Sequence, residues 1–308
     1  MDVPGLLDPE IAARLAAVPF PAIGADNYLE FRNRAVRPEL SDRVERVEHV
    51  VPSDPPVRLR VHRARDATAP APCVYSIHSG GFVIGSCDVD DATFDRWCPQ
   101  FGIVGVSVGY RLAPETTYPG ALDDCDAGLH WIEAHADELG IDRRAIGVFG
   151  VSGGGGLAAA LALRLRDRGE RLLSFQLLDC PMLDDRQRTP SSRADDMPIW
   201  SRESNAFGWR SYLGELYGTD RVPYTAAPAR ATDLAGLPPA FVSVGALDGF
   251  RDEDIEYAQR LMQAGVPTEL HVYPGLPHGV QLFTDAEVVK QAGRDRDAWL
   301  GRQLARLR

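Results

Sequence analysis

A serine flanked by glycines is the residue best placed to do chemistry in this sequence. Gly150-Val151-Ser152-Gly153-Gly154 follows the β-rich segment 146–149 and precedes a helical run that begins at Leu157. A nucleophile on such a strand-to-helix turn has a strained backbone, so the residues two before and two after it must be small. Both are glycine here. The pattern predicts that Ser152 is a nucleophile for acyl transfer.

A second glycine-rich stretch, His78-Ser79-Gly80-Gly81-Phe82, directly follows the β-rich segment 73–77. Residues without a Cβ atom allow main-chain amides to come close to a developing oxyanion. We therefore predict that the amides of Gly80, Gly81 and Gly153 form an oxyanion hole. His78 is expected to orient this loop rather than to react.

An aspartate and a histidine follow late β-rich segments, in the chain order Ser, Asp, His that suits this chemistry. Asp248 comes after segment 240–244, and His278 lies in a turn-rich stretch after segment 270–273. Ligands of open α/β sheets bind beyond the carboxyl ends of the strands. We predict that His278 is the general base and that Asp248 orients it. The other histidines fall within expected strands or helices: His49, His62, His130, His135 and His271.

The same glycine-rich region also fits a dinucleotide-binding fingerprint. Residues 154–159 match G-x-G-x-x-A, and Asp179 follows the next β-rich segment in the place of a ribose-binding acid. Such a fingerprint normally follows the first strand of its unit, whereas several β-rich segments come earlier here. A dinucleotide site would also leave the other motifs unexplained. The remaining alternative for this region is a glycine-rich connector without a chemical role.

The elements that must position these residues are eight β-rich segments separated by amphipathic ones. The first two alternate apolar and polar residues around Asp54-Pro55-Pro56, which predicts an antiparallel pair. The later six are apolar, as strands buried on both faces are, with long helical stretches between them. We predict an α/β fold with a mostly parallel eight-stranded sheet and flanking helices. The segments are 44–51, 57–63, 73–77, 103–108, 146–149, 174–178, 240–244 and 270–273, and the helical stretches include 121–139, 157–168 and 252–264.

Two regions do not fit this alternation, and we expect them to form a helical cap over the site. They are residues 1–43 and the insertion 184–228, which leaves 44–183 and 229–308 as the catalytic core. Aromatic residues near the expected site are predicted to contact the substrate and to enclose a pocket for short acyl chains. These are Phe82, Trp200, Phe207 and Trp209.

Composition narrows the classes of function. The 308 residues, 44% of them hydrophobic and 25% charged, are typical of a globular protein. No apolar run reaches 18 residues and the start of the chain is rich in acids, so we expect a cytoplasmic protein without a membrane segment. A net charge of −11 disfavours both nucleic acid and an anionic membrane as partners. The five cysteines form no CxxC pair, so reduced thiols are expected.

No cofactor or metal is predicted. Lys290 is the only lysine, so mechanisms that need a catalytic lysine within another motif, such as a P-loop or a Ser-x-x-Lys site, are excluded. The acidic clusters lack the glycine and closing glutamate of a calcium-binding loop, and we interpret them as helix caps and solvated faces. They are Asp88, Asp90 and Asp91, Asp123, Asp124 and Asp126, and Asp252, Glu253 and Asp254.

In combination these motifs resemble those of the hormone-sensitive-lipase-like carboxylesterases, a branch of the α/β hydrolases with an N-terminal cap. Residues 78–81 are similar to the family's HGGG, 110–115 to YRLAPE, 150–154 to GDSAG, and 248–253 to DPLRDE, while Pro277-His278-Gly279 resembles the loop of its catalytic histidine. The resemblance spans residues 70 to 285. It implies an α/β-hydrolase fold, the triad Ser152, Asp248 and His278, and structural roles for residues 110–115 and Asp252.

The resemblance also implies a serine carboxylesterase that takes small esters with short to medium acyl chains and forms an acyl-enzyme. Ser79, Val151 and Gly153 are among the positions that depart from the family motifs. None removes a triad side chain, so they bear on efficiency and preference. An amidase or lactonase would use the same triad, and a noncatalytic receptor similar to plant gibberellin receptors would lack the histidine that is present here. A homodimer is left open.

Overall fold

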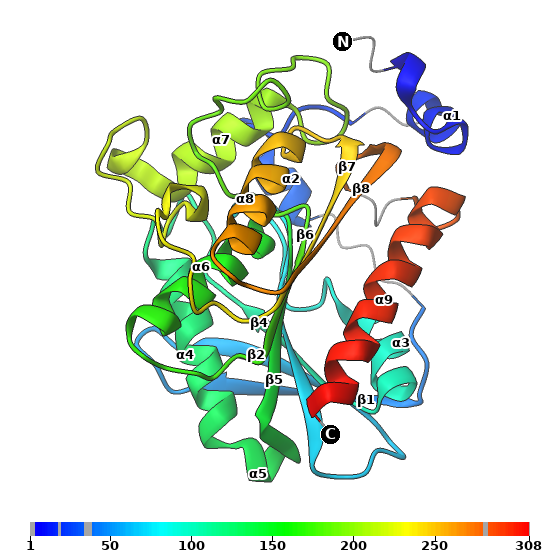
Figure 1. Ribbon diagram of the computed structural model, residues 1–308, viewed down its shortest axis with the longest axis vertical. Helices are drawn as coiled ribbons and strands as arrows, with labels where there is room; N and C mark the ends of the chain where they lie inside the picture. Colours follow the sequence, from blue (N-terminus) through cyan, green and yellow to red (C-terminus); the bar gives the residue numbers. More distant parts are fainter. Residues whose placement is uncertain (1–3, 18–19, 34–38, 280–282, 308) are drawn as a thin grey trace.

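Eight strands form one sheet in a computed structural model that describes residues 4–17, 20–33, 39–279 and 283–307 (Figure 1). The strand order across the sheet is β1-β2-β4-β3-β5-β6-β7-β8. The prediction of an eight-stranded α/β fold is therefore confirmed. The strands are β1 (Val44–Val51), β2 (Val57–Ala64), β3 (Ala71–Ile77), β4 (Val104–Gly109), β5 (Ile141–Val151), β6 (Phe175–Asp179), β7 (Ala240–Leu247) and β8 (Thr268–Pro277).

Strand direction follows the hydrophobic pattern of the sequence. β1 pairs antiparallel with β2, and β2 pairs antiparallel with β4, whereas every pair from β4 through β3 to β8 is parallel. β3 and β6 are buried along their whole length, as expected of strands covered on both faces. The carboxyl ends of the parallel strands consequently lie along one edge of the sheet.

Helices cover both faces of the sheet (Figure 1). On one face α4 contacts β4, α6 contacts β5 and β6, and α8 contacts β7 and β8, while α3 and α9 lie on the other face. Each face has its own apolar core. The bounds are α3 (Asp91–Phe101), α4 (Gly120–Ala134), α5 (Ala136–Leu139), α6 (Gly153–Asp167), α8 (Arg251–Gln263) and α9 (Glu287–Leu307), with 3₁₀ turns η1 (Pro4–Leu6), η2 (Gly214–Leu216) and η3 (Pro228–Arg230).

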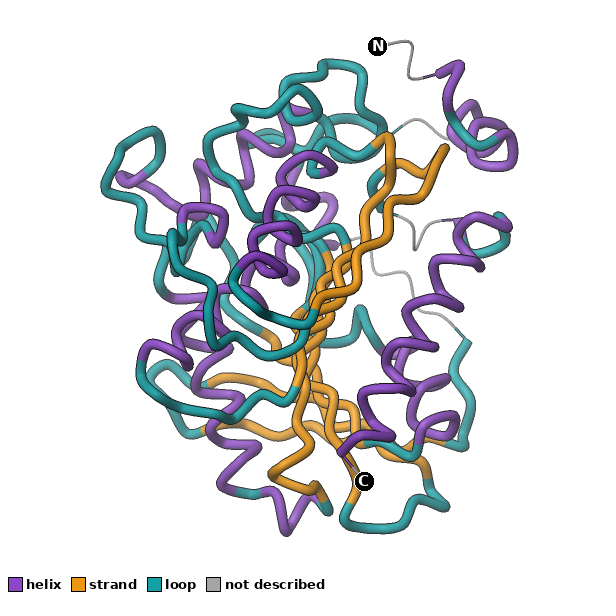
Figure 2. Tube along the Cα trace, viewed as in Figure 1, coloured by secondary structure: helices purple, strands orange, loops and turns teal. Residues whose placement is uncertain are grey.

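The two regions predicted to form a cap do contact one another. Helix α2 (Tyr28–Asn33) packs on α7 (Arg202–Leu213), where the rings of Tyr28 and Phe207 are 5.7 Å apart. The amide of Ile23 donates to Ser204 Oγ at 2.9 Å. Helix α1 (Pro9–Ala17) lies apart from α2 and packs near the end of β8 instead, with Ile11 among Tyr273 and Leu276 (Figure 2).

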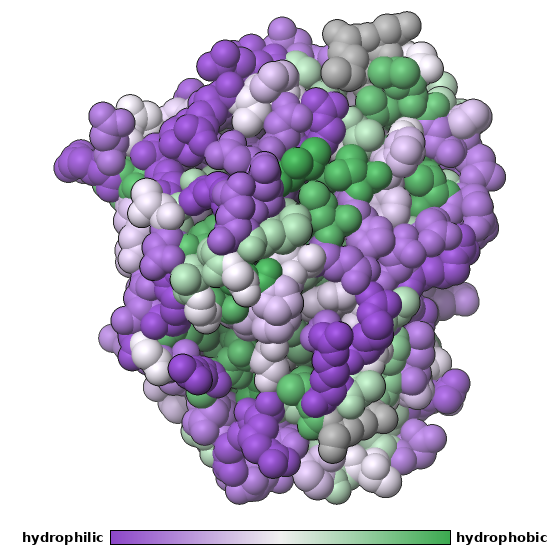
Figure 3. Space-filling model, viewed as in Figure 1, coloured by the Kyte–Doolittle hydropathy of each residue, from purple (hydrophilic) through white to green (hydrophobic). Residues whose placement is uncertain are grey.

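Most of the molecular face shown in Figure 3 is hydrophilic, with hydrophobic areas near α1 and the ends of β7 and β8 and further ones in the lower half. The acidic clusters are less exposed than the sequence predicts. Asp91 is buried between Arg60 and His62, and Asp124 is buried against Arg111. The interpretation as solvated faces is therefore wrong for Asp91 and Asp124, because distant basic partners compensate for their burial, whereas Asp88 and Asp123 are exposed.

Candidate active site

Ser152 occupies a sharp turn between the end of β5 and the start of α6, with a φ of 56°. A Cβ atom on Gly150 would lie 2.3 Å from the carbonyl oxygen of Gly154, and one on Gly154 would lie 2.0 Å from that of Ile77. Real Cβ atoms do not come so close to backbone, so only glycine fits at either position. The local sequence therefore imposes the sharp, strained turn on which such a nucleophile is held.

Ser152, His278 and Asp248 form one hydrogen-bonded chain. His278 Nε2 lies 2.9 Å from Ser152 Oγ, and His278 Nδ1 lies 2.7 Å from Asp248 Oδ2. The other carboxylate oxygen, Oδ1, accepts the amide of Phe250 at 2.9 Å. All three side chains are buried, and they follow β5, β7 and β8 at the same edge of the sheet. The three residues predicted to be nucleophile, base and orienting acid are thus in contact.

The glycine-rich loop of residues 78–84, which we call the oxyanion loop, lies against Gly153. A Cβ atom on Gly153 would be 3.0 Å from the amide nitrogens of Gly81 and Phe82. Among the described residues, neither Gly80 nor Gly81 donates its amide to another group, whereas the carbonyl of Gly80 accepts two amides within the loop. The loop therefore offers unused amides beside Gly153. The part of each amide as an oxyanion donor stays a prediction.

His78, the first residue of this loop, is held by contacts of its ring and its backbone. Its ring stacks on Tyr110 with centroids 4.0 Å apart, and its Nδ1 donates to the carbonyl of Ser79 at 2.8 Å. Burial lowers the pKa of His78 to about 4, so the ring is neutral at neutral pH. The hydroxyl of Tyr110 donates to the carbonyl of His78 at 3.0 Å. These contacts agree with an orienting role and give His78 no contact with Ser152.

Trp200 contacts the site directly, unlike the other predicted aromatic residues. A Cβ atom on Gly81 would lie 2.1 Å from its Cη2 atom, and its ring is 6.2 Å from that of His278. Phe82 and Trp209 pack on each other and on Tyr212, and Phe207 packs on Tyr28. The structure thus places Phe82, Trp209 and Phe207 in the packing between cap and core.

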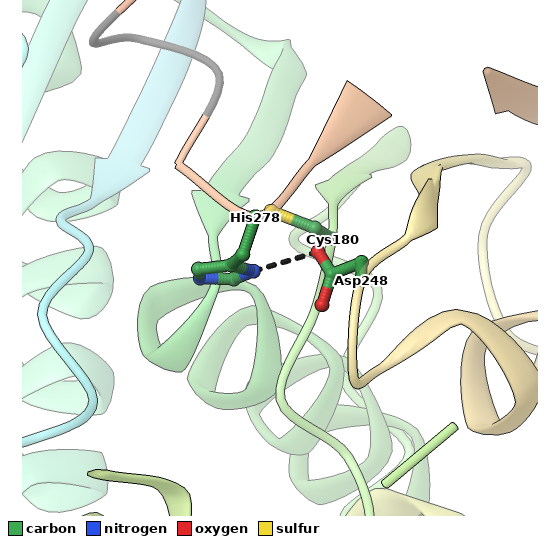
Figure 4. Close-up of side chains that lie close together, drawn as sticks. All are labelled: Cys180, Asp248 and His278. Carbon is green, nitrogen blue, oxygen red and sulfur yellow. Dashed lines mark hydrogen bonds and ion pairs between the residues drawn. The ribbon is translucent and has the colours of Figure 1, made fainter. Parts of the chain in front are cut away.

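Two neighbours of the triad, Phe250 and Cys180, were not predicted from the sequence. The ring of Phe250 lies edge-on to His278, with centroids 5.1 Å apart. Cys180 Sγ, an Asp248 oxygen and a His278 nitrogen all lie within 4.8 Å of one another (Figure 4). Both residues come just after the carboxyl end of a strand, close to Asp179 and Asp248. That position was the signal that could have identified them.

The set of Cys180, Asp248 and His278 offers the atom types of a metal site. Two of its three members already bond each other through the 2.7 Å contact between Nδ1 and Oδ2. Burial raises the pKa of the Cys180 thiol well above its ordinary value, so it is a neutral thiol. We therefore treat Cys180 as a packing neighbour of the triad and interpret His278 and Asp248 as a base and the acid that orients it.

Comparison with known proteins agrees with this geometry. A family model described as alpha/beta hydrolase fold matches residues 74–282, which include Ser152, Asp248 and His278. The chain belongs to the hormone-sensitive-lipase-like family of α/β hydrolases. Esterase LipI of Mycobacterium tuberculosis is 37% identical over 89% of this chain and 87% of its own length. Carboxylesterase NlhH of the same organism is 35% identical over 90% of this chain and 89% of its own length.

Solved structures extend the family likeness to almost the whole chain. The structure titled "Bacterial Heroin Esterase" superposes with a TM-score of 0.92 at 41% identity, covering 97% of this chain and 98% of that one. Esterase LipW from Mycobacterium marinum superposes with a TM-score of 0.86 at 34% identity, covering 99% of this chain and 97% of the LipW chain. As a member of this hormone-sensitive-lipase-like family, the chain is a carboxylic ester hydrolase, and the receptor alternative is not favoured. Within the described part of the chain, no helix has the length and apolar character needed to span a membrane.

Proposed function

We propose that the chain is a serine carboxylesterase for small esters, with Ser152 as nucleophile, His278 as base and Asp248 as orienting acid. The observation that carries the proposal is the continuous chain of contacts from Ser152 Oγ through His278 to Asp248, at 2.9 and 2.7 Å. A proton on Nδ1 faces a carboxylate in this arrangement, so Nε2 is free to take the proton of the serine.

The reaction then proceeds in two balanced halves. His278 takes the hydroxyl proton of Ser152 while the serine oxygen attacks the ester carbonyl, and the amides of Gly80, Gly81 and Gly153 bind the oxyanion. Collapse of this intermediate breaks the ester bond, and the alcohol leaves with the proton from His278. A water molecule next gives its proton to His278 and attacks the acyl-enzyme. Ser152 recovers the proton as the carboxylic acid departs.

Preference for short to medium acyl chains is the second part of the proposal. The rings of Trp200 and Phe250 lie 6.2 and 5.1 Å from the ring of His278 and form an apolar wall beside it. Each buried methylene of an acyl chain gains about 0.8 kcal/mol until it meets such a wall. A relative named ethyl acetate hydrolase, from Pseudomonas putida, is 32% identical over 72% of this chain. Both facts support a small acyl group.

The test is a panel of p-nitrophenyl esters from acetate to palmitate, with one amide and one lactone, assayed on wild type and on Ser152→Ala. We expect turnover of short esters that depends on Ser152, and a kcat/KM that falls toward palmitate. A maximum at the long end would contradict the acyl preference. Faster turnover of the amide or lactone would instead favour the alternative that uses the same triad. Absence of any turnover that depends on Ser152 would overturn the mechanism.

Three further assignments belong to the proposal. We propose that residues 1–43 and 184–228 act together as the cap, which the contacts between α2 and α7 support. Truncation of 1–43 should then impair ester hydrolysis, and full activity of the shortened chain would contradict it. Location in the cytoplasm and a homodimer also stay predictions. Cell fractionation tests the location, and sedimentation equilibrium tests the homodimer.

A further inference from the structure

Arg32, on cap helix α2, contacts the backbone beside the oxyanion loop. Its Nε donates to the carbonyl of Val83 at 2.6 Å, and its Nη2 donates to the carbonyl of Ala113 at 2.6 Å. Val83 belongs to the loop and directly follows Phe82. A side chain of the N-terminal segment is therefore bonded to the loop that carries the proposed oxyanion donors.

The guanidinium of Arg32 is held firmly in this position. Glu115 accepts from Nη1 at 2.9 Å and from Nη2 at 2.8 Å, and the ring of Tyr28 lies 4.9 Å from the guanidinium carbon. The hydrogen bonds from Arg32 lower the pKa of Glu115, so the acid is ionised at neutral pH. Because the guanidinium is planar and its donors have fixed directions, bonds to three residues leave it little freedom.

The oxyanion loop needs such support. Gly80, Gly81 and Phe82 have φ angles of 124°, 55° and 68°. Phe82 carries a side chain, so its left-handed conformation is unfavourable and persists only where the surroundings impose it. The amide of Ala113 donates to the carbonyl of Phe82 at 2.9 Å, and the carbonyl of the same Ala113 accepts from Arg32. Arg32 thus bonds both to the loop and to the backbone that holds the loop.

We infer that Arg32 is a positioning residue for the oxyanion hole. By fixing the carbonyls of Val83 and Ala113, it keeps the strained turn at Gly80, Gly81 and Phe82 in the orientation that presents unused amides to the substrate. The N-terminal segment therefore contributes to stabilising the transition state in addition to covering the pocket. This inference rests on the proposed function, because an oxyanion hole acts only in acyl transfer.

The variants Arg32→Lys and Arg32→Gln test the inference. A lysine has one compact charged group and cannot bond both carbonyls and Glu115 in this planar arrangement. Deleting an oxyanion donor typically lowers kcat by about 10²- to 10³-fold, so a displaced loop should lower it by about 10- to 100-fold, with KM little changed. Titration of active sites with a fluorophosphonate restricts the measured kcat to folded molecules.

A transition-state analogue separates positioning from a merely structural role. An aryl trifluoromethyl ketone adds to Ser152 and places an oxyanion in the hole, so its affinity should fall by the same factor as kcat. Affinity for a non-reactive ester analogue, such as the corresponding ether, should stay unchanged. Unchanged ketone affinity, or a rise in KM with normal kcat, would overturn the inference.

Glu115→Gln is the matched control, because it removes the ion pair while its amide oxygen can still accept from the guanidinium, and the bonds of Arg32 to both carbonyls stay. We expect its kcat to stay within about twofold of wild type. A loss as large as that of Arg32→Lys would show that the ion pair matters and would overturn the inference. If wild type hydrolyses p-nitrophenyl acetate and Arg32→Lys has the same kcat, this inference is refuted and the proposed function stands. Wild type without turnover that depends on Ser152 refutes the proposed function.

Discussion

His278 Nδ1 and Asp248 Oδ2 are 2.7 Å apart, in a pair that is almost completely shielded from water. Because a carboxylate oxygen can only accept, this contact places the proton on Nδ1. The second carboxylate oxygen is occupied by the amide of Phe250. Asp248 therefore has a fixed orientation, and it fixes the tautomer of the base.

Replacing Asp248 by asparagine should lower kcat for p-nitrophenyl acetate by about 10⁴-fold, because the amide favours the wrong tautomer of His278. The variant should keep the circular dichroism spectrum of wild type. Asp252→Asn is the control, since that acid bonds the amide of Ser191 instead. A loss of less than about tenfold in Asp248→Asn would show that another acid fills the role.

Two neighbouring glycines should respond differently to alanine. A Cβ atom at Gly154 meets the carbonyl oxygens of Ile77 and His78 at 2.0 and 2.4 Å, whereas one at Gly153 meets its nearest atoms at 3.0 Å. We expect Gly154→Ala to lower the free energy of unfolding by about 3 kcal/mol, through backbone overlap, and Gly153→Ala by less than about 1 kcal/mol. Urea denaturation measures both. Equal losses would contradict the close packing of the turn.

Trp200→Ala should move the best substrate toward longer acyl chains. The ring lies against Gly81 and close to His278, so its removal lengthens the space beside the nucleophile. Trp209→Phe serves as the control, since Trp209 packs on Phe82 and Tyr212 and should affect stability alone. The measurement is kcat/KM across acyl lengths. An unchanged profile in Trp200→Ala would remove Trp200 from the substrate pocket.

His78 should make the protein less stable in acid. Burial lowers its pKa in the folded state to about 4, below the ordinary value of 6.5, so the unfolded chain binds the proton more readily between these values. This contribution to stability is fully present above about pH 6.5 and is lost as the pH falls toward about 4, amounting to about 3 kcal/mol. His78→Phe keeps a ring against Tyr110 but cannot titrate. The test measures the urea midpoint of wild type and of His78→Phe between about pH 4 and 6.5. The same pH dependence in both proteins would contradict the lowered pKa of His78.

The parts of the site that depend on local sequence could be predicted. Ser152 was identifiable because Gly150 and Gly154 meet a requirement of the turn itself, and Asp248 and His278 because each closely follows a segment with the residue pattern of a strand. β1 begins and ends where the alternating pattern places it. β5 begins at Ile141, before the apolar segment that was predicted, because its first residues are partly polar.

Features that depend on contacts between distant segments could not be predicted. Arg32 carries no local signal, and its partners lie 51 to 83 residues away in the chain. Asp91 and Asp124 resemble solvated acids until Arg60, His62 and Arg111 are placed beside them. A single sequence therefore identifies the reacting groups more readily than the residues that hold them.

The base follows β8, which is the last strand of the sheet, whereas Asp248 follows its inner neighbour β7. An outer strand has hydrogen bonds on one side only, and such strands open before the centre of a sheet does. Separation of β8 from β7 would part His278 from Asp248 while the rest of the core stays folded. The contact of Asp8 with Gly275 ties the N-terminal region to this strand. We therefore expect heating to inactivate the enzyme by local separation of β8 from β7 before the whole fold unfolds.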